Sequence, residues 1–134
     1  MSRILIIDDE PSVRRALRRV LEKFGHEVDE AGDGAAGAIL CASVHPDLVI
    51  TDVIMPKMNG IDATKLIRES NPNVRILAIS GGGNFEEQSY KPEAITTSAY
   101  LAAAERAGAD SVMTKPFDRA ELMERVDALL ALKR

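Results

Sequence analysis

The sequence predicts a doubly wound α/β fold, in which a parallel β-sheet is covered by helices on both faces. Short runs rich in β-branched residues alternate with amphipathic stretches from one end of the chain to the other, the pattern of successive βαβ units. The chain has 134 residues, 46% of them hydrophobic, which is enough for one core and too few for two domains. We therefore expect residues 1–134 to form a single domain.

The first half of the chain contains two strand–helix pairs. An apolar run predicts a strand over residues 3–7, and Pro11, which suits the first turn of a helix, predicts where the first helix begins. Gly25 ends that helix. A second strand is expected over 27–30 and a second helix over 34–42. The buried face of the first helix is predicted to consist of Val13, Leu17, Val20, Leu21 and Phe24.

The second half contains three more pairs. Strands are expected over residues 48–51, 74–79 and 111–114, and helices over 61–70, 96–107 and from Asp118 onward. Gly108 closes the fourth helix, and Asp118 with Glu121 has the spacing of a capping box. Residues 81–95 form a polar segment that begins with three glycines, and it is long for a strand-to-helix connection. We interpret it as a loop inserted before the fourth helix.

The composition excludes several classes of partner. A net charge of −4 with 28% charged residues disfavours nonspecific binding to nucleic acid or to an anionic membrane. No apolar stretch approaches the roughly 20 residues of a membrane span, and the first residues are too short an apolar run for a signal sequence. Cys41, the single cysteine, cannot form an internal disulfide. These features predict a cytoplasmic protein.

Chemically active side chains lie at the ends of four predicted strands. Ligands of an open parallel sheet bind outside the carboxyl ends of its strands. Asp8 and Asp9 follow the first strand, Asp52 the third, Ser80 the fourth and Lys115 the fifth. Each of these residues alone has an ordinary structural explanation, but together they predict one pocket, because right-handed crossovers bring all the strand ends to one edge.

The predicted pocket requires a cation. Two carboxylates about 4 Å apart repel each other by ~4 kcal/mol at an effective dielectric constant of about 20. Oxygen ligands without a nearby His or Cys favour a hard ion such as Mg²⁺ or Mn²⁺, and Mg²⁺ readily accepts a phosphate oxygen as well. Lys115 adds a mobile positive charge that suits both a carboxylate and a phosphate. The sequence therefore predicts a site that receives a phosphate on a carboxylate.

These motifs resemble those of the receiver domains of two-component response regulators. The resemblance extends over nearly the whole chain, and it implies a flavodoxin-like sheet with strand order 2-1-3-4-5 and five helices. An acid pair, a D-x-x-M-P-x-M-x-G block and a Lys-Pro pair in this order form a specific combination. The matching stretches are Ile6 to Pro11, Asp52 to Gly60, Ser80 with Gly81, and Lys115 to Phe117.

The resemblance implies a role for each acidic residue of the pocket. Asp52 is expected to be the phosphorylated nucleophile, and Asp9 the direct ligand of the divalent cation. Asp8 would hold metal-bound water, and the backbone carbonyl of Ile54 would complete the protein ligands. The implied partner is a sensor histidine kinase or a histidine phosphotransfer protein, which would supply the phosphoryl group.

Four further residues are assigned by the same resemblance. Ser80 and Lys115 would each hold a phosphoryl oxygen, and the small Gly81 would leave room for the incoming group. Pro116 corresponds to the family's cis-proline, which would fix the direction of Lys115. Phosphorylation would pull Ser80 and its loop inward, and this movement would transmit the change to the fourth and fifth elements.

The chain departs from the family pattern at the residue that usually reports phosphorylation. Receivers usually carry an aromatic residue three positions before the lysine, where this chain has Val112. We hypothesise that the 81–95 insertion, through Tyr90 or Tyr100, replaces that aromatic as the moving part; an insertion without a signalling role is the alternative. Ile54 and Gly82 occupy positions that tune dephosphorylation and cannot orient water, which predicts a persistent phosphoryl group.

The polar side of the first helix is a candidate docking surface. It carries Arg14, Arg15, Arg18 and Arg19. One interpretation is a solvated face, and the other is a surface for the kinase or phosphotransfer helical bundle, which in this family usually docks on the first helix. Because the chain ends after the fifth helix, we expect no output domain, and the output would be contact with a downstream protein target.

Three other functions are alternatives to a phosphoacceptor switch. A flavin-binding module needs a glycine- and hydroxyl-rich loop where Asp8 and Asp9 stand. A phosphatase with an aspartyl-phosphate intermediate typically has a second acid two residues after the nucleophile, where this chain has Ile54, so we expect a switch without independent substrate turnover. A third alternative, a receiver-like interaction module that signals without phosphorylation, is not excluded, because Val112 departs from the family pattern.

Overall fold

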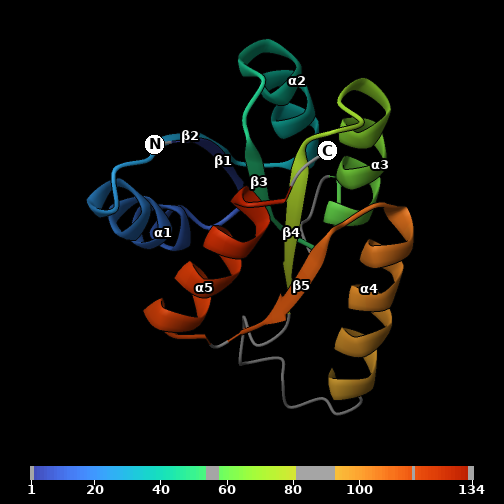
Figure 1. Ribbon diagram of the computed structural model, residues 1–134. Helices are drawn as coiled ribbons and strands as arrows, with labels where there is room; N and C mark the ends of the chain where they lie inside the picture. Colours follow the sequence, from blue (N-terminus) through green and yellow to red (C-terminus); the bar gives the residue numbers. More distant parts are fainter. Residues whose placement is uncertain (1, 54–57, 81–92, 116, 133–134) are drawn as a thin grey trace.

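The protein is built on one parallel sheet of five strands. The computed structural model describes residues 2–53, 58–80, 93–115 and 117–132. The strands run in the order β2-β1-β3-β4-β5, and every neighbouring pair is parallel. Figure 1 shows them in the middle of the molecule. Their bounds are Arg3–Ile7 for β1, Glu27–Ala31 for β2, Leu48–Asp52 for β3, Arg75–Ser80 for β4 and Ser111–Thr114 for β5.

Helices cover both faces of the sheet. Helices α1 and α5 lie on one face, and α2, α3 and α4 lie on the other (Figure 1). This arrangement is the doubly wound fold that the sequence predicted, with the strand order that the resemblance implied. The helices span Pro11–Lys23, Gly34–Val44, Gly60–Ser70, Glu93–Ala107 and Arg119–Leu130, as α1 to α5.

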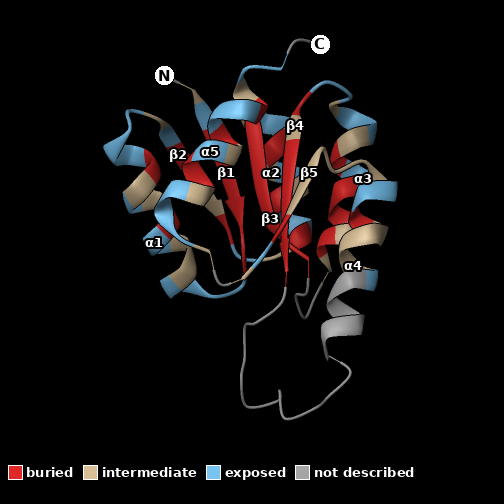
Figure 2. Cartoon of the chain, turned by 60° about the horizontal axis from the view of Figure 1, so that its bottom comes forward, coloured by how far each residue is buried: buried red, intermediate tan, exposed pale blue. Residues whose placement is uncertain are grey.

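Alternate residues of each central strand point to opposite layers of the core. Ile4 and Ile6 pack toward α1 and α5, whereas Leu5 and Ile7 pack toward α2 and α3. All four are fully buried, as expected of a central parallel strand covered on both faces. Figure 2 shows the resulting band of buried residues through the middle strands, with exposed residues on the outer sides of the helices.

Short side chains at the helix starts supply the expected caps. Asp33, Asn59 and Asp118 each accept a hydrogen bond from the backbone N–H three residues later, at the beginnings of α2, α3 and α5. Helix α1 begins at Pro11, as predicted. Gly108, which follows α4, has a φ of 125°, a conformation that glycine adopts far more readily than other residues.

Several predicted boundaries were off by one to three residues. Strand β3 extends to Asp52 and β4 to Ser80, so both site residues lie at the last position of their strands rather than just beyond them. Helix α4 begins at Glu93, three residues before the predicted Thr96. Such shifts are normal for element ends, where the hydrogen-bond pattern changes gradually. In the part of the chain that the structure describes, no helix is long and apolar enough to cross a membrane.

Candidate functional site

Three aspartates meet at the carboxyl-terminal edge of the sheet. Asp8 and Asp9 follow β1, and Asp52 ends the neighbouring strand β3. One carboxylate oxygen from each of the three lies within 4.8 Å of the others. Asp8 is 3% exposed and Asp52 is 9% exposed, while Asp9 faces solvent. The structure thus brings together the acidic residues that the sequence singled out.

Lys115 approaches this acidic cluster from the other side. Its backbone N–H donates to the carbonyl of Ser80, so the pairing of β4 with β5 continues into the site. Its Nζ lies 3.7 Å from Asp52 Oδ2 and 3.9 Å from Asp8 Oδ2. Both distances are ion-pair distances and are longer than a hydrogen bond. The sequence anticipated the pairing with Asp52 but not the equally close pairing with Asp8.

The electrostatics of the cluster favour a bound cation. Burial raises the pKa of the Asp8 carboxyl, and neither the hydrogen bond from the Glu10 backbone nor the charge of Lys115 fully offsets it. Among the residues that the structure describes, three carboxylates face one ammonium group, and all the metal-binding atoms are oxygens. A hard divalent cation such as Mg²⁺ matches this donor set. Asp8, Asp9 and Asp52 are therefore the described residues that could hold it.

Ser80 lies at the end of β4 between the strands that carry Asp52 and Lys115. The side chain is fully buried. Its Oγ has no hydrogen-bond partner among the residues that the structure describes. Because a buried hydroxyl without a partner costs free energy, such a group is well suited to an acceptor that arrives from outside.

The backbone around Asp52 is held by the start of α3. Gly60 donates its N–H to the carbonyl of Val53 at 2.7 Å. A Cβ at position 60 would lie 2.2 Å from the carbonyl oxygen of Asp52, a separation that no side chain tolerates. Gly60 is therefore required for α3 to approach the acidic strand end. The sequence motif contained this glycine, but its reason became visible only in the structure.

The four arginines of α1 are not equivalent. Arg14 and Arg18 both bind Glu30 of β2, with Nε and Nη1 respectively at 2.9 and 2.6 Å. Arg15 and Arg19 are exposed, and neither has an ion pair within the described residues. The polar side of the helix therefore carries two arginines paired with Glu30 and two that have no ion pair among the described residues. Glu30 was missed, although it stands two residues after Val28 and therefore lies on the same face of β2, toward α1.

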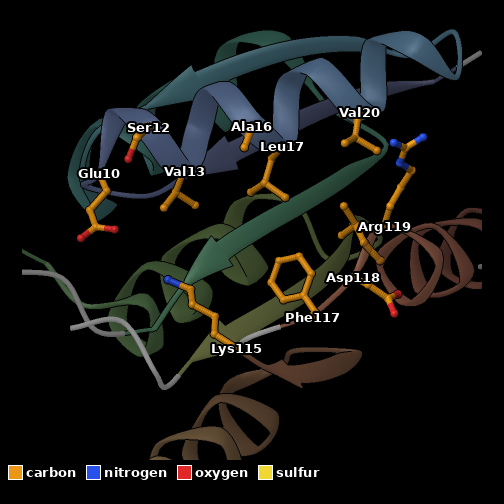
Figure 3. A pocket seen from close by; sticks show the side chains of 11 residues that line it. Glu10, Ser12, Val13, Ala16, Leu17, Val20, Lys115, Phe117, Asp118 and Arg119 are labelled. Atoms are coloured by element: carbon orange, nitrogen blue, oxygen red, sulfur yellow. The ribbon is translucent and has the colours of Figure 1, made fainter. Parts of the chain in front are cut away.

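A pocket of about 490 Å³ lies between α1 and the start of α5 (Figure 3). Its floor is apolar, with Val13, Leu17 and Phe117 among its lining residues. Lys115, one of the residues at the acidic cluster, also lines it. Figure 3 shows Phe117 facing the inner side of α1 across the pocket. Sequence periodicity predicted Val13 and Leu17 as core residues of α1, but not that the helix leaves this opening.

Val112 lies on the opposite face of the sheet, under α4. It packs in a small apolar cluster with Val53 and Ala78 from the sheet and with Tyr100 and Ala104 from α4. The apolar cluster against which Val112 packs thus also receives an aromatic side chain, which comes from the helix rather than from β5. Tyr100 is only partly buried.

Some of the predicted site residues fall outside the described part of the chain. These are Ile54, Gly81, Gly82, Tyr90 and Pro116. Of the predicted 81–95 insertion, only the backbone from Glu93 onward is described, as the start of α4. The roles expected for these residues remain predictions.

Comparison with known sequences places the fold and the acidic edge in a family context. The model described as Response regulator receiver domain matches residues 4–127. Response regulator MprA of Mycolicibacterium vanbaalenii is 35% identical over 128 residues, which make up 96% of this chain and 50% of that protein. The chain therefore spans about half the length of the curated relatives it matches.

Solved structures show the same architecture over nearly the entire chain. A LuxR family two-component response regulator from Aurantimonas sp. SI85-9A1 has a TM-score of 0.82 and 34% identity, and the match covers 100% of this chain and 88% of that one. A response regulator receiver domain protein from Clostridium thermocellum has a TM-score of 0.79 and 25% identity, with 97% and 94% covered.

Proposed function

The chain belongs to the response regulator receiver domain family, and on this basis we propose that it is a phosphoacceptor switch whose Asp52 accepts a phosphoryl group. Receiver domains are regulatory switches. The observation that carries the proposal is the position of Lys115 Nζ, 3.7 Å from Asp52 and 3.9 Å from Asp8, at the edge where three carboxylates meet. The phosphodonor would be a phosphohistidine on a sensor kinase or a histidine phosphotransfer protein.

The described side chains can divide the chemistry among them. A carboxylate oxygen of Asp52 attacks phosphorus in line with the leaving imidazole, so that an O–P bond forms as the N–P bond breaks. The Lys115 ammonium offsets charge on the phosphoryl oxygens, and the buried hydroxyl of Ser80, which lacks a partner among the described residues, donates to one of them. A divalent cation held by the three aspartates supplies further positive charge when bound.

A single labelling experiment tests this proposal. Wild-type protein and Asp52→Asn are incubated with acetyl phosphate and Mg²⁺, and the intact mass is followed. We expect one added phosphoryl group on the wild type and none on the variant, with no labelling of either when EDTA removes the cation. Labelling of both proteins would overturn the assignment of Asp52. Labelling of neither would favour the alternative, a receiver-like interaction module that signals without phosphorylation.

The pocket between α1 and α5 supports a docking site for the phosphodonor. It presents an apolar floor beside Lys115, and the same helix carries Arg15 and Arg19, which have no ion pair with any described residue. An amphipathic helix with acidic flanks suits such a groove. Charge reversal at Arg15 and Arg19 should slow transfer from a phosphohistidine partner but not from acetyl phosphate. Equal slowing of both reactions would contradict docking at this surface.

Tyr100 is our candidate for the moving part of the readout. It packs against the apolar cluster that contains Ala78, a residue of the strand that ends at Ser80, and Val112 packs against the same cluster. We expect Tyr100→Ala to abolish the phosphorylation-dependent change in amide hydrogen exchange along α4. Leu101→Ala, from the same apolar cluster, is the matched control and should retain that change. If Tyr100→Ala responds like the parent protein, Tyr100 is not the moving part, and only the same result for Tyr90→Ala would also exclude a role for the insertion.

A further inference from the structure

Arg14 is the one described side chain of α1 that reaches the backbone of the acidic cluster. Its Nη1 donates to the carbonyl oxygen of Asp8 at 2.6 Å. The same guanidinium group donates through Nε to Glu30 Oε1 at 2.9 Å. Arg14 thus connects the backbone of Asp8, the first residue of the aspartate pair, with an acidic side chain on the edge strand β2.

Glu30 holds this guanidinium group in place. Its other oxygen, Oε2, accepts from Arg18 Nη1 at 2.6 Å, so one carboxylate joins two arginines of α1. Burial opposes the ionised form of Glu30, but hydrogen bonds from Arg18 and Arg14 outweigh that effect and lower its pKa. The side chains of Arg14 and Glu30 are only 19% and 22% exposed. The pair is therefore ordered rather than a loose surface contact.

The backbone at Asp8 needs such a fixed point. Asp8 donates its N–H to Ala31 of β2, and its Oδ1 accepts the N–H of Glu10. Beyond it the chain leaves the sheet, and mutual repulsion among the three carboxylates favours their separation. A charged donor on the Asp8 carbonyl, anchored from behind by Glu30, resists that separation because the carbonyl cannot turn away without losing a strong hydrogen bond.

We propose that Arg14 is a positioning residue for the divalent cation. By binding the Asp8 carbonyl, Arg14 holds the Asp8 and Asp9 carboxylates at the separation that the cation requires. The inference rests on the proposed function only in assuming that these aspartates bind the cation. Arg14 does not touch the cation; it acts on the residues that do, as outer partners of metal ligands commonly do. The planar fork of arginine matters here, because a lysine ammonium cannot reach Glu30 and the Asp8 carbonyl in the same arrangement.

Arg18 provides the matched control. It binds the same Glu30 carboxylate from the same helix, yet its third contact is the carbonyl of Val28 rather than that of Asp8. A purely structural role, tying α1 to β2, would therefore be shared by both arginines. Arg18 also binds Glu22 within α1, but of the two arginines only Arg14 contacts the acidic cluster.

The test compares Arg14→Lys with Arg18→Lys, which keep the charge. Mn²⁺ is the probe, and its dissociation constant is measured by electron paramagnetic resonance. We expect Arg14→Lys to weaken Mn²⁺ binding about tenfold, and Arg18→Lys to change it less than about twofold. In the metal-free proteins, exchange of the Glu10 amide hydrogen should become faster only in Arg14→Lys. Unchanged Mn²⁺ affinity in Arg14→Lys, or equal weakening in both variants, would overturn the inference.

Two further measurements keep the outcome clear. The first measurement uses the wild-type protein, so it does not depend on whether a variant folds. In nuclear magnetic resonance spectra, Mg²⁺ should shift the Nε–H resonance of Arg14 and leave that of Arg18 unchanged. An unaffected Arg14 signal would count against the proposal. Phosphorylation of wild type and Asp52→Asn is assayed in parallel. If Asp52 is not phosphorylated but Arg14→Lys still loses Mn²⁺ affinity, the proposed function fails while the role of Arg14 stands.

Discussion

The two edges of the sheet carry two charged clusters of opposite character. At the amino-terminal edge, Arg68 of α3 binds Asp110 at 3.1 Å and donates to the carbonyls of Pro72, Val74 and Gly108. The same Asp110 oxygen accepts the backbone N–H of Ile76. Charge and hydrogen-bonding capacity are matched there, and the cluster joins the end of α3 to the starts of β4 and β5.

At the carboxyl-terminal edge the balance is different. Three carboxylates face one ammonium group at ion-pair distance, and the buried Ser80 hydroxyl has no partner among the described residues. Both clusters lie at the same sheet and combine carboxylates with a basic side chain, Arg68 at one edge and Lys115 at the other. A charged cluster whose groups have matched partners stabilises the fold. A cluster with more carboxylates than cations and a buried hydroxyl without a partner among the described residues is suited to bind a ligand.

The largest expected effect comes from breaking the matched cluster. Arg68→Ala removes the ion pair with the partly buried Asp110 and the hydrogen bonds to three backbone carbonyls, and we expect it to lower the free energy of unfolding by about 2–3 kcal/mol. Urea denaturation measures this loss. Lys65→Ala, at an exposed position of the same helix, should cost far less. The folded Arg68→Ala protein should still be phosphorylated at the wild-type rate, and a slower rate would show that the two edges are coupled.

An intermediate effect of opposite sign is expected at the acidic edge. Asp8→Asn removes a buried charge from a crowded cluster while an amide oxygen can still accept the N–H of Glu10. In the presence of EDTA we expect it to raise the free energy of unfolding by about 1 kcal/mol. Mg²⁺ should stabilise the variant less than the wild type. Destabilisation by Asp8→Asn without cation would contradict the view that this cluster is strained.

The smallest effect concerns the link between α1 and β2. Because the pKa of Glu30 is lowered in the folded state, its ionised form stabilises the protein above its unfolded pKa, and that contribution disappears as the pH falls through the lowered value. Glu30→Gln should therefore be less stable than wild type at neutral pH, by less than about 1 kcal/mol. The difference should vanish in acid. Urea denaturation at neutral and acidic pH measures it, and a constant difference would exclude this origin.

Periodicity and strand ends were sufficient to predict most of the fold and the acidic site. The strands of this chain are short and strongly apolar, and Asp8, Asp52 and Lys115 follow from the rule that parallel strands end at one edge. The Arg14 bond to the Asp8 carbonyl could not be predicted in this way. A side chain that binds a backbone atom leaves no complementary residue in the sequence, so nothing in the residue pattern marks the pair.

The Arg68 cluster and Gly60 were missed for related reasons. Four of the contacts of Arg68 are to backbone carbonyls, which every residue possesses. Gly60 appeared only as a letter in a motif, because the need for a missing Cβ depends on how close α3 lies to Asp52. Tertiary distances of this kind are set by packing rather than by local propensity.

Helix α3 joins the two edges of the sheet, and it is held at both of its ends. Its first residue, Gly60, is pressed against the Asp52 carbonyl, and Arg68 in its last turn is tied to Asp110. One inserted residue would lengthen the helix by about 1.5 Å and turn its far end by about 100°. Insertions and deletions between these two residues should therefore destabilise the fold, because the spacing of eight positions matches the distance between the Asp52 strand end and Asp110.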